Sequence, residues 1–593
     1  MKQLNNMLLA AALLSVSLNA AGQKAKKDTT LNRVVVVEKE YNPDIMDASK
    51  VNVLPKVQEP FVGKRTIEYN MSLLPISSLE EMMNPVTRNL DQAKAKWGFA
   101  QLGYGNYGNL DARAAYLFDL SPRDQLNVSG SLEGMNASLK LPEIFESAYQ
   151  NRNWKSRYYR TKLNADYQHR FDRVLLDAAV NFGTDNFNYH AFLEPENALM
   201  PSLTDKQHHA KWSLHAGIKS LDKNFPLQFQ AETNFLSFKK SYPESVTEKI
   251  WRTKGDVYGM IGEQQRVGIK AEMNNFFYSK TGYRSYTSLE LNPYYVFSND
   301  SWKVRLGAHV DYSSLNNNVD GGKSSPAIQV SPDIETQYLF AKSYVAYLKL
   351  VGGQELNDFR RLESLNPYAN FYQQNNSYNQ LDAMLGFKAN VGGGFWFDLF
   401  AGYNIINDDL CFSNLFSNMI NLAKPYTETE DTKHFYIGSK LKYTYRGMAD
   451  FSLKGTYYSW KNSDMNYMLM KPKFDLQFNA DVKVLPKLTI NAGYRYIARS
   501  EVNLNYIDVV ASDYINPALS GSGLSDSFIS PVVHGSAVKL SPVSDLSLGA
   551  TYNLSDDISI FARFSNIMNK DYQYYYSYPV QGINFLAGAS IRF

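Results

Sequence analysis

The sequence contains almost no cysteine, because Cys411 is the only one among 593 residues. A lone cysteine excludes an intramolecular disulfide and a cysteine-based zinc cluster. A strong charge of either sign is also missing, since 61 Lys and Arg residues stand against 58 Asp and Glu residues. A formal net charge of +3 gives no electrostatic footprint for nucleic acid, and we therefore expect no nucleic-acid partner.

Long apolar runs are absent as well, and the mean hydropathy is -0.37. The best candidate, Met7 to Leu18, is well short of the ~20 apolar residues that a membrane-spanning helix needs. This excludes a helical membrane protein. Lys2 before the run and Ala20-Ala21-Gly22 after it are typical of a secretory signal peptide. We expect residues 1–22 to be removed by cleavage after Gly22, and no cysteine follows the run to make the chain a lipoprotein.

The sequence is rich in aromatic residues, at 14%, and in strict alternation of apolar and polar residues. In the stretch 474–484 every even position is apolar and every odd position is polar. The same alternation recurs at 162–171, 488–496 and 546–554. Successive side chains of a β-strand point to opposite faces, so each stretch predicts a strand with one apolar and one polar face.

These strands are ~10 residues or longer, which is the length that a tilted strand needs to cross a bilayer. A soluble β-sandwich also alternates, but its strands are shorter, ~5–6 residues on average. In lipid a sheet is stable only when it closes on itself, because every backbone group must find a partner. We therefore predict an all-β fold: a transmembrane, antiparallel, up-and-down β-barrel in the cell outer membrane, with lipid and lipopolysaccharide around it and a polar lumen.

Short turns are expected on the periplasmic side and long loops on the extracellular side. The long loops are expected near 135–155, 191–205, 315–327, 359–378, 410–433, 461–472 and 500–540. Up-and-down order also requires a strand from Lys249 to Tyr258 and a turn near Gly262. The count is 22 strands, with 20 or 24 as alternatives. The short turns are Ser121-Pro122-Arg123-Asp124, Asp172-Arg173, Ser298-Asn299-Asp300, Ala341-Lys342-Ser343, Gly392-Gly393-Gly394, Arg446-Gly447, Leu485-Pro486-Lys487 and Ser555-Asp556-Asp557.

The end of the chain carries a family pattern. It consists of Asn566-Ile567-Met568-Asn569-Lys570-Asp571-Tyr572, then Tyr578-Pro579-Val580-Gln581-Gly582, then a strand from Phe585 to Phe593. This resembles the barrel of TonB-dependent receptors of the Bacteroidota type, over about residues 97–593. The resemblance implies transport or ligand uptake across the outer membrane. The terminal Phe593 also resembles the signal that the outer-membrane assembly machinery reads.

The N-terminal part, residues 23–96, departs from that family. Leu31 to Val37 is similar to a TonB box, the segment that couples by strand addition to the energy-coupling protein TonB, although an edge strand or a tether explains it too. The stretch is shorter than the family's plug domain and lacks its motifs. It is punctuated by prolines, with one short helix expected from Ser78 to Met83. We expect three parts: a signal peptide (1–22), an extended segment without a full plug (23–96) and the barrel (97–593).

Several local patterns imitate chemical sites. Gly103, Gly105 and Gly108 match a dinucleotide-binding pattern, but a strand rather than a helix follows, so a hairpin is expected. The calcium-loop start at Asn316, Asn318 and Asp320 lacks its acidic ligand, because residue 327 is Ala327. Incidental calcium binding in this loop stays open.

The remaining candidates are weaker. His208, His209 and His215 share one expected strand, but His209 and His215 are too far apart along it for a metal site. Gly521-Ser522-Gly523 lacks the spacing of a nucleophile elbow. We therefore predict no catalytic, metal or cofactor residue and no enzyme, although residues from distant strands could still assemble a hydrolase.

The loop from Asn366 to Gln380 mixes aromatic and amide side chains, namely Tyr372, Gln373, Gln374, Asn375, Asn376 and Tyr378. Such a mixture suits glycan or peptide binding, but loop solubility and an interfacial aromatic belt explain the same residues more simply. Two functions remain open. One is transport through the barrel. The other is a plugless, non-transporting barrel that serves as a structural subunit of a larger envelope complex.

Overall fold

The computed structural model describes residues 82–83, 96–141, 153–190, 206–222, 225–242, 244–315, 327–370, 372–413, 415–417, 426–462, 471–499, 502–513, 527–538, 540–575 and 577–593. The chain divides into two units, Met1–Glu59 and Pro60–Phe593, and every described residue belongs to the second. Within these residues no helix is long and apolar enough to cross a membrane.

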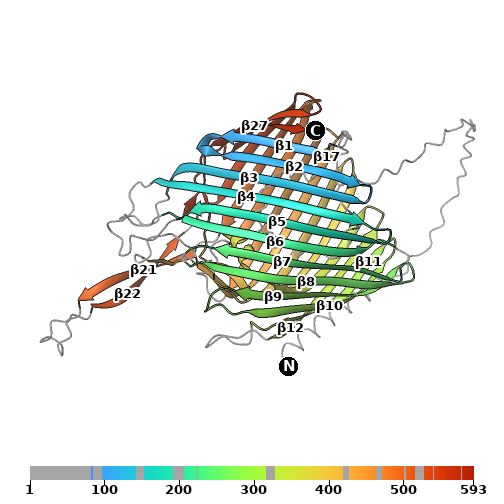
Figure 1. Cartoon of the computed structure of the whole chain (residues 1–593), viewed down its shortest axis with the longest axis horizontal. Helices are drawn as coiled ribbons and strands as arrows, with labels where there is room; N and C mark the ends of the chain where they lie inside the picture. Colours follow the sequence, from blue (N-terminus) through green and yellow to red (C-terminus); the bar gives the residue numbers. More distant parts are fainter. Residues whose placement is uncertain are drawn as a thin grey trace, which may run out of the picture. The chain divides into compact units, whose positions relative to one another are not determined.

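The described residues form a sheet of 22 strands. Figure 1 shows β2 to β9 side by side and tilted in one wall of this sheet. The sheet is built from β1 (Gly98–Gly105), β2 (Leu110–Ser121), β3 (Asp124–Lys140), β4 (Asn153–Arg170), β5 (Val174–Asn188), β6 (Lys206–Ser220), β7 (Leu227–Lys240), β8 (Val246–Ile261), β9 (Gln265–Tyr278), β10 (Tyr286–Ser298), β11 (Trp302–Ser313), β12 (Ile328–Phe340), β13 (Tyr344–Glu355), β14 (Ser377–Gly392), β15 (Phe395–Ser413), β17 (Tyr426–Tyr445), β18 (Ala449–Asn462), β19 (Pro472–Leu485), β20 (Leu488–Arg499), β23 (Val543–Asn553), β24 (Ile558–Ser565) and β27 (Asn584–Arg592).

The remaining elements lie in the connections between these strands. They are the 3-10 turn η2 (Asn106–Gly108), the helix α2 (Phe359–Leu365), and the short strands β16 (Leu415–Ser417), β21 (Val502–Asp513), β22 (Ser527–Val538), β25 (Gln573–Tyr575) and β26 (Tyr578–Pro579). β16 pairs with β21 in parallel, and β21 pairs with β22 as an antiparallel hairpin. These three strands form a sheet separate from the barrel.

The barrel closes where the first strand meets the last. β1 and β27 are antiparallel, and Gly103 lies opposite Gly588. The seam is completed by two backbone hydrogen bonds, from Gly98 N to Phe593 O (2.7 Å) and from Phe593 N to Gly98 O (3.0 Å). Gly588 is needed for this contact, because a Cβ there would lie 2.1 Å from the carbonyl oxygen of Leu102. The predicted closed, antiparallel barrel of 22 strands is confirmed.

The two faces of each strand have opposite chemistry. On β4, Leu163 and Tyr167 face outward and are exposed, whereas Lys162 and Asp166, on the alternate positions, face the lumen. Aromatic rings gather on the outer face near the short turns, where Trp302 stacks on Tyr338 at 4.4 Å. Such a belt marks the interface between lipid and water, and the outer face is therefore a lipid-facing surface.

The short turns lie where the sequence places them. Between β14 and β15 the three glycines Gly392, Gly393 and Gly394 all have positive φ, a conformation that costs glycine little. Gly447 and Gly262 have positive φ for the same reason. The strand expected from Lys249 to Tyr258 is confirmed inside β8.

Three expectations about the connections need correction. The loop expected at 410–433 is mostly strand, because β15 and β17 continue pairing up to Ser413 and Tyr426. The loop expected at 359–378 begins with α2, and the loop expected at 500–540 contains the β21–β22 hairpin. In each case the alternation that marks membrane-spanning strands is lost outside the lipid, since no apolar outer face is needed there.

The glycine pattern at 103–108 lies in a hairpin, as expected. Gly103 and Gly105 are on β1, and Gly108 is in the turn that leads into β2. The helix expected from Ser78 to Met83 falls largely outside the described residues, and Met82 and Met83 are not helical. The signal peptide and the run from Leu31 to Val37 lie entirely outside them.

A charge placed on the outer face should unfold the barrel more easily than one placed inside it. Leu163→Arg near the middle of β4 should lower the free energy of unfolding by ~2–4 kcal/mol, the cost of a guanidinium at the bilayer midplane. The measurement is equilibrium unfolding in denaturant of the barrel folded in lipid vesicles. The folded fraction is read from heat-modifiable migration on SDS gels.

Gln168→Arg on the same strand is the matched control, because Gln168 points into the lumen and is exposed there. Its effect should stay below about 0.5 kcal/mol. Equal losses for the two variants would contradict the assignment of the two faces.

Candidate functional site

The connection between β13 and β14 contains a short helix, α2, which begins with a typical N-cap residue. Asp358 is the N-cap residue, and its side chain accepts a hydrogen bond from Arg361 N at 2.8 Å. Phe359 and Leu362 are three residues apart and therefore share one face of α2. Both are completely buried. A helix of seven residues is not stable alone, so contacts with other parts of the chain must hold it.

These contacts come from strands that are not neighbours of β13 or β14. The ring of Phe359 lies 5.9 Å from that of Phe238 on β7 and 5.8 Å from that of Tyr278 on β9. Tyr283, between β9 and β10, lies 6.1 Å away, and burial raises its pKa to about 12. Phe238 faces the lumen, since it alternates with outward positions on β7. The helix therefore lies inside the barrel, at the end that carries the long loops.

The apolar cluster around α2 joins side chains from β3, β4, β5, β7, β8 and β15. Tyr368, just after the helix, stacks on Tyr578 of β26 at 3.9 Å. Trp154 of β4 packs edge-on against both rings, at 6.1 and 5.4 Å. The buried members of the cluster are Ala137, Leu139, Trp154, Phe187, Tyr189, Phe238, Tyr242, Val246, Phe359, Leu362, Tyr368, Ala369, Leu410, Phe412, Leu540 and Tyr578. The β13–β14 loop, residues 356–376, thus packs against several walls at once, and we call it the lumenal loop.

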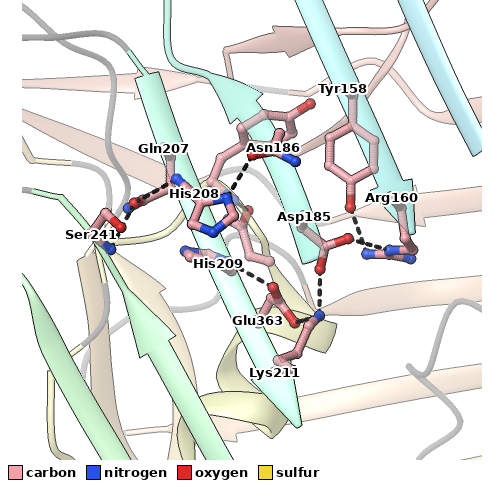
Figure 2. A network of polar contacts seen from close by, with 12 residues as sticks. Tyr158, Arg160, Asp185, Asn186, Gln207, His208, His209, Lys211, Ser241 and Glu363 are labelled. Carbon is pink, nitrogen blue, oxygen red and sulfur yellow. Dashed lines mark hydrogen bonds and ion pairs between the residues drawn. The ribbon is translucent and has the colours of Figure 1, made fainter. Parts of the chain in front are cut away.

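A chain of charged groups fixes the helix to the barrel wall, as Figure 2 shows. Glu363 Oε1 lies 2.7 Å from His209 Nδ1, and Glu363 Oε2 accepts a hydrogen bond from Lys211 Nζ at 2.5 Å. Lys211 also pairs with Asp185 on β5. Asp185 in turn accepts from Arg160 Nε of β4 at 2.6 Å. The network therefore alternates in sign across β4, β5, β6 and α2.

The carboxylate of Glu363 is 5% exposed and that of Asp185 fully buried. Buried charges of this kind persist only when they are paired, because leaving water is costly for each of them. Breaking one pair should therefore weaken the attachment of the loop. The alternation of signs means that each carboxylate has a cationic neighbour and no carboxylate of this network is left alone.

Backbone groups of the helix are tied to the wall by further side chains. Glu248 of β8 accepts hydrogen bonds from Phe359 N and from the Tyr278 hydroxyl, both at 2.9 Å. Arg360 Nη2 donates to the carbonyl oxygens of Trp212 (2.8 Å) and Ser237 (2.9 Å). Burial lowers the pKa of Arg360, against the pull of the neighbouring carboxylates. None of these contacts is a strand ladder, so the lumenal loop could leave without breaking the sheet.

The mixture of aromatic and amide residues in this loop serves its own folding. Asn376 Oδ1 accepts from Tyr286 OH at 3.2 Å, and the backbone oxygen of Asn375 accepts from Asn357 Nδ2 at 2.6 Å. Gln373 bonds to the backbone N–H and C=O of Arg284, at 2.8 and 2.7 Å. Tyr378 is on β14 and buried, whereas Tyr372 is 40% exposed. The side chain of Gln373 and the side-chain oxygen of Asn376 therefore have partners in the β9–β10 connection and on β10.

A second segment touches the lumenal wall. Met82 N donates a hydrogen bond to Gln337 Oε1 at 3.0 Å. Gln337 faces the lumen on β12 and is 1% exposed. At the short-turn end, Lys96 Nζ forms an ion pair with Asp557 at 2.8 Å. Met82, which belongs to the N-terminal segment expected from the sequence, therefore lies against the inside of the barrel.

The histidines singled out in the sequence do not meet around a metal. His209 and His215 both face the lumen, but His209 pairs with Glu363 and His215 pairs with Asp177. His208 bonds to Asn186 at 2.6 Å on the exposed face. Among the described residues no group of three or more His, Cys, Asp or Glu side chains is placed to hold a metal ion.

The other patterns named above, the calcium-like run at 316–321 and Gly521 to Gly523, lie outside the described residues. The sequence did not point to Glu363, Lys211 or Asp185, and it singled out His209 only as a metal candidate. The one available signal was Asn357-Asp358 before two apolar residues at helical spacing, which is a helix start within a predicted loop.

The comparisons with known proteins bear on the fold. No family model and no curated protein matches the sequence. Solved structures do match. A mutant of the ferric enterobactin receptor PfeA from Pseudomonas aeruginosa has a TM-score of 0.60 at 10% identity, covering 85% of this chain and 81% of that chain. The siderophore receptor PirA from Acinetobacter baumannii has a TM-score of 0.59 at 12% identity, with 84% and 80% covered.

The copper transporter OprC matches with a TM-score of 0.56 at 12% identity, covering 84% of this chain and 80% of that chain. At such identities the similarity shows the fold. The chain has the large outer-membrane barrel fold of these receptors, as expected from its sequence.

Removing the charge of Glu363 should loosen the lumenal loop without unfolding the barrel. Glu363→Gln leaves His209 without its carboxylate and Lys211 with Asp185 alone, and breaking a buried pair is strongly destabilising. We expect trypsin to cleave at Arg360 and Arg361 at least about tenfold faster, equivalent to ~1.4 kcal/mol of local stability. The measurement is the cleavage rate of the folded barrel in detergent.

Glu355→Gln is the matched control. Glu355 pairs with Arg361, but its side chain is 56% exposed, and exposed pairs contribute ~0–1 kcal/mol. Its cleavage rate should rise less than about threefold. Similar rates for Glu363→Gln and wild type would show that the charged network does not hold the loop.

Proposed function

We propose that this chain acts in ligand uptake across the outer membrane, as a barrel whose lumen is gated by the lumenal loop, residues 356–376. The observation that carries the proposal is the position of this loop. It folds inward and packs on walls that it does not adjoin, through side chains rather than strand pairing. A loop in this place controls what enters from the long-loop side.

The lumen itself suits a transport path. Barrels with this many strands enclose a lumen that must be filled when no solute passes. Here the inward residues are polar and of both signs, as in the pairs Arg305–Asp333 (2.7 Å) and Arg495–Asp475 (2.5 Å). Once the loop has moved, a polar wall can form hydrogen bonds with water and polar solutes in the lumen.

The attachments of the loop suit a gate rather than a permanent seal. They are ion pairs and hydrogen bonds of single side chains, which a polar ligand can replace one by one. Loops that open for ligands are drawn from the less stable parts of a fold. The loop-to-wall network of Glu363, Lys211 and His209 would then be the contact that a ligand exchanges for its own.

The solved structures with the same fold are named as receptors and a transporter, which supports uptake here. The resemblance of the barrel end to TonB-dependent receptors points the same way. Coupling to TonB through Leu31 to Val37 and the lack of a full plug in residues 23–96 remain parts of this proposal, with Bacteroidota as the expected source.

One observation favours the alternative, a structural subunit of a larger envelope complex. The β21–β22 hairpin and β16 form a sheet of their own outside the barrel sheet. Among the described residues, β22 pairs on one side alone, with β21. A strand edge of this kind can accept a strand from another protein, and such an edge serves assembly rather than passage through the lumen.

Excising the lumenal loop should open the barrel. Glu355 and Ser377 pair directly, so residues 356–376 can be replaced by Asn-Gly, the preferred two-residue hairpin turn. We expect the single-channel conductance in planar bilayers to rise from near zero to a stable open level. Cells with this variant should also become sensitive to large hydrophilic antibiotics that the outer membrane excludes.

The control replaces residues 463–470 between β18 and β19, a connection of the same barrel end, by a Gly-Ser linker of equal length. It should leave the conductance low. An unchanged conductance after removal of the lumenal loop, or a rise that needs the loss of residues 23–83 as well, would contradict the loop as the gate.

The two functions predict different partners. If the chain works in uptake, affinity purification in mild detergent should recover the barrel without stoichiometric envelope proteins, and deletion of residues 502–538 should change little. Stoichiometric partners that disappear when this hairpin is deleted would favour the structural role. The measurement is the protein ratio in the purified complex before and after the deletion.

A further inference from the structure

Three acidic residues lie side by side on the lumenal wall, away from the network of Glu363. The register places Glu272 of β9 opposite Glu290 of β10, and Glu290 opposite Asp311 of β11. Directly opposite residues on neighbouring strands have Cβ atoms about 4.5–5.5 Å apart, and like charges in this position destabilise a sheet. A row of three adjacent carboxylates is therefore stable only if nearby positive charges compensate it.

Two of the three carboxylates obtain it from the protein. Glu272 pairs with Lys254 at 3.2 Å and with Arg252 at 3.5 Å. Glu290 Oε1 lies 2.8 Å from His309 Nδ1. Arg252 and Lys254 lie on β8, next to β9, and His309 lies on β11, next to β10. They form ion pairs with Glu272 and Glu290 but not with Asp311.

Asp311 is the exception. Its side chain is 1% exposed, and neither carboxylate oxygen has a hydrogen-bond partner of normal geometry among the described residues. The imidazole of His309 and the backbone N–H of Gln354 attract this carboxylate, whereas Glu290 and Glu272 repel it. The nearest buried ion pair, Arg305–Asp333, is complete without it, since Arg305 Nε binds Asp333 at 2.7 Å. A buried carboxylate beside another carboxylate, with no ion pair of its own among the described residues, is a costly arrangement.

Neutral oxygens complete the surroundings. The hydroxyls of Ser331 on β12 and Tyr378 on β14 are buried, face each other and have no hydrogen-bond partner of normal geometry among the described residues. Tyr378 also interacts electrostatically with Asp311. The backbone at Gly352 approaches Ser331 closely, because a Cβ there would lie 2.8 Å from the serine oxygen. Two carboxylates and two buried hydroxyls therefore lie on nearby strands in one part of the lumenal wall.

We propose that Asp311 and Glu290 form a binding site for a hard cation of the calcium type, completed by neutral oxygen ligands. Calcium takes six to eight oxygens, from carboxylates, hydroxyls, carbonyls and waters, in flexible geometry. Among the described residues no group of three or more His, Cys, Asp or Glu side chains is placed to hold a metal ion, so neutral oxygens and waters would have to supply most of the ligands here. A bound cation would compensate Asp311 and cancel its repulsion with Glu290.

The site lies where the lumenal loop leaves the wall. β13 has a bulge between Val351 and Gly353, and Gly353 has a φ of +133°. Gln354, one residue before the end of β13, accepts a hydrogen bond from Ser288 at 2.5 Å. A cation held by β10 and β11 would therefore also steady the root of the loop. The cation site does not depend on uptake and would exist in a structural subunit as well.

Terbium luminescence and thermal unfolding test the site in the full-length barrel purified in detergent. Terbium(III) is a calcium substitute that tyrosine and tryptophan sensitise. Wild type should show a saturable signal that calcium displaces, and millimolar calcium should raise its Tm by several degrees. Asp311→Asn and Glu290→Gln should each weaken terbium binding at least tenfold and abolish the shift in Tm.

Asp119→Asn is the matched control, because Asp119 is a lumenal carboxylate that is exposed and has one charge to lose. It should bind terbium as wild type does. Asp311→Asn should still fold, as it removes an unpaired charge, and heat-modifiable migration checks this. Equal terbium binding by Asp311→Asn and wild type would overturn the site. So would a higher Tm of Asp311→Asn with no calcium effect in wild type, which would mean that Asp311 is simply protonated.

Discussion

The requirement that every backbone N–H and C=O in lipid find a partner determines the rest of this structure. An open sheet would leave two edges of unpaired groups in hydrocarbon, where each costs several kcal/mol. The chain meets this requirement by joining β1 to β27, with glycines where the two strands approach most closely. Once the sheet is closed, one face of each strand must be apolar and the other encloses a lumen. The polar lumen, the aromatic belt and the inward loop are consequences of closure.

The lumen places charged residues of both signs on neighbouring strands. Most of them are paired across strands, and the pairs extend into the lumenal loop through Glu363. The same wall therefore provides the attachment of the loop and also contains Asp311, a buried carboxylate beside Glu290. A single change of register would turn these charges toward lipid, because side chains alternate with a period of two. The polar pattern of the lumen thus also fixes the pairing of the strands.

The sequence alone was sufficient to predict the barrel but not the loop that folds into its lumen. Alternation such as that of 474–484 predicted strands, faces and count, because the lipid imposes a period of two on every span. Turn residues such as Gly392 to Gly394 marked the short connections, since their backbone needs positive φ. The lumenal loop escaped prediction. Its helix is only seven residues long, and Glu363 meets His209 and Lys211 only after the loop has folded inward. Long-range contacts of this kind leave no periodic trace in a sequence.

The seam between β1 and β27 has a consequence for biogenesis. The two strands that must join are the first and the last of the barrel, so nearly every strand has to be in place before the ring can be sealed. Contacts between such distant parts of a chain form slowly, and until then both margins of the growing sheet stay available for mispairing and aggregation. Closing the barrel therefore depends on keeping these two margins from pairing with other chains until they meet each other.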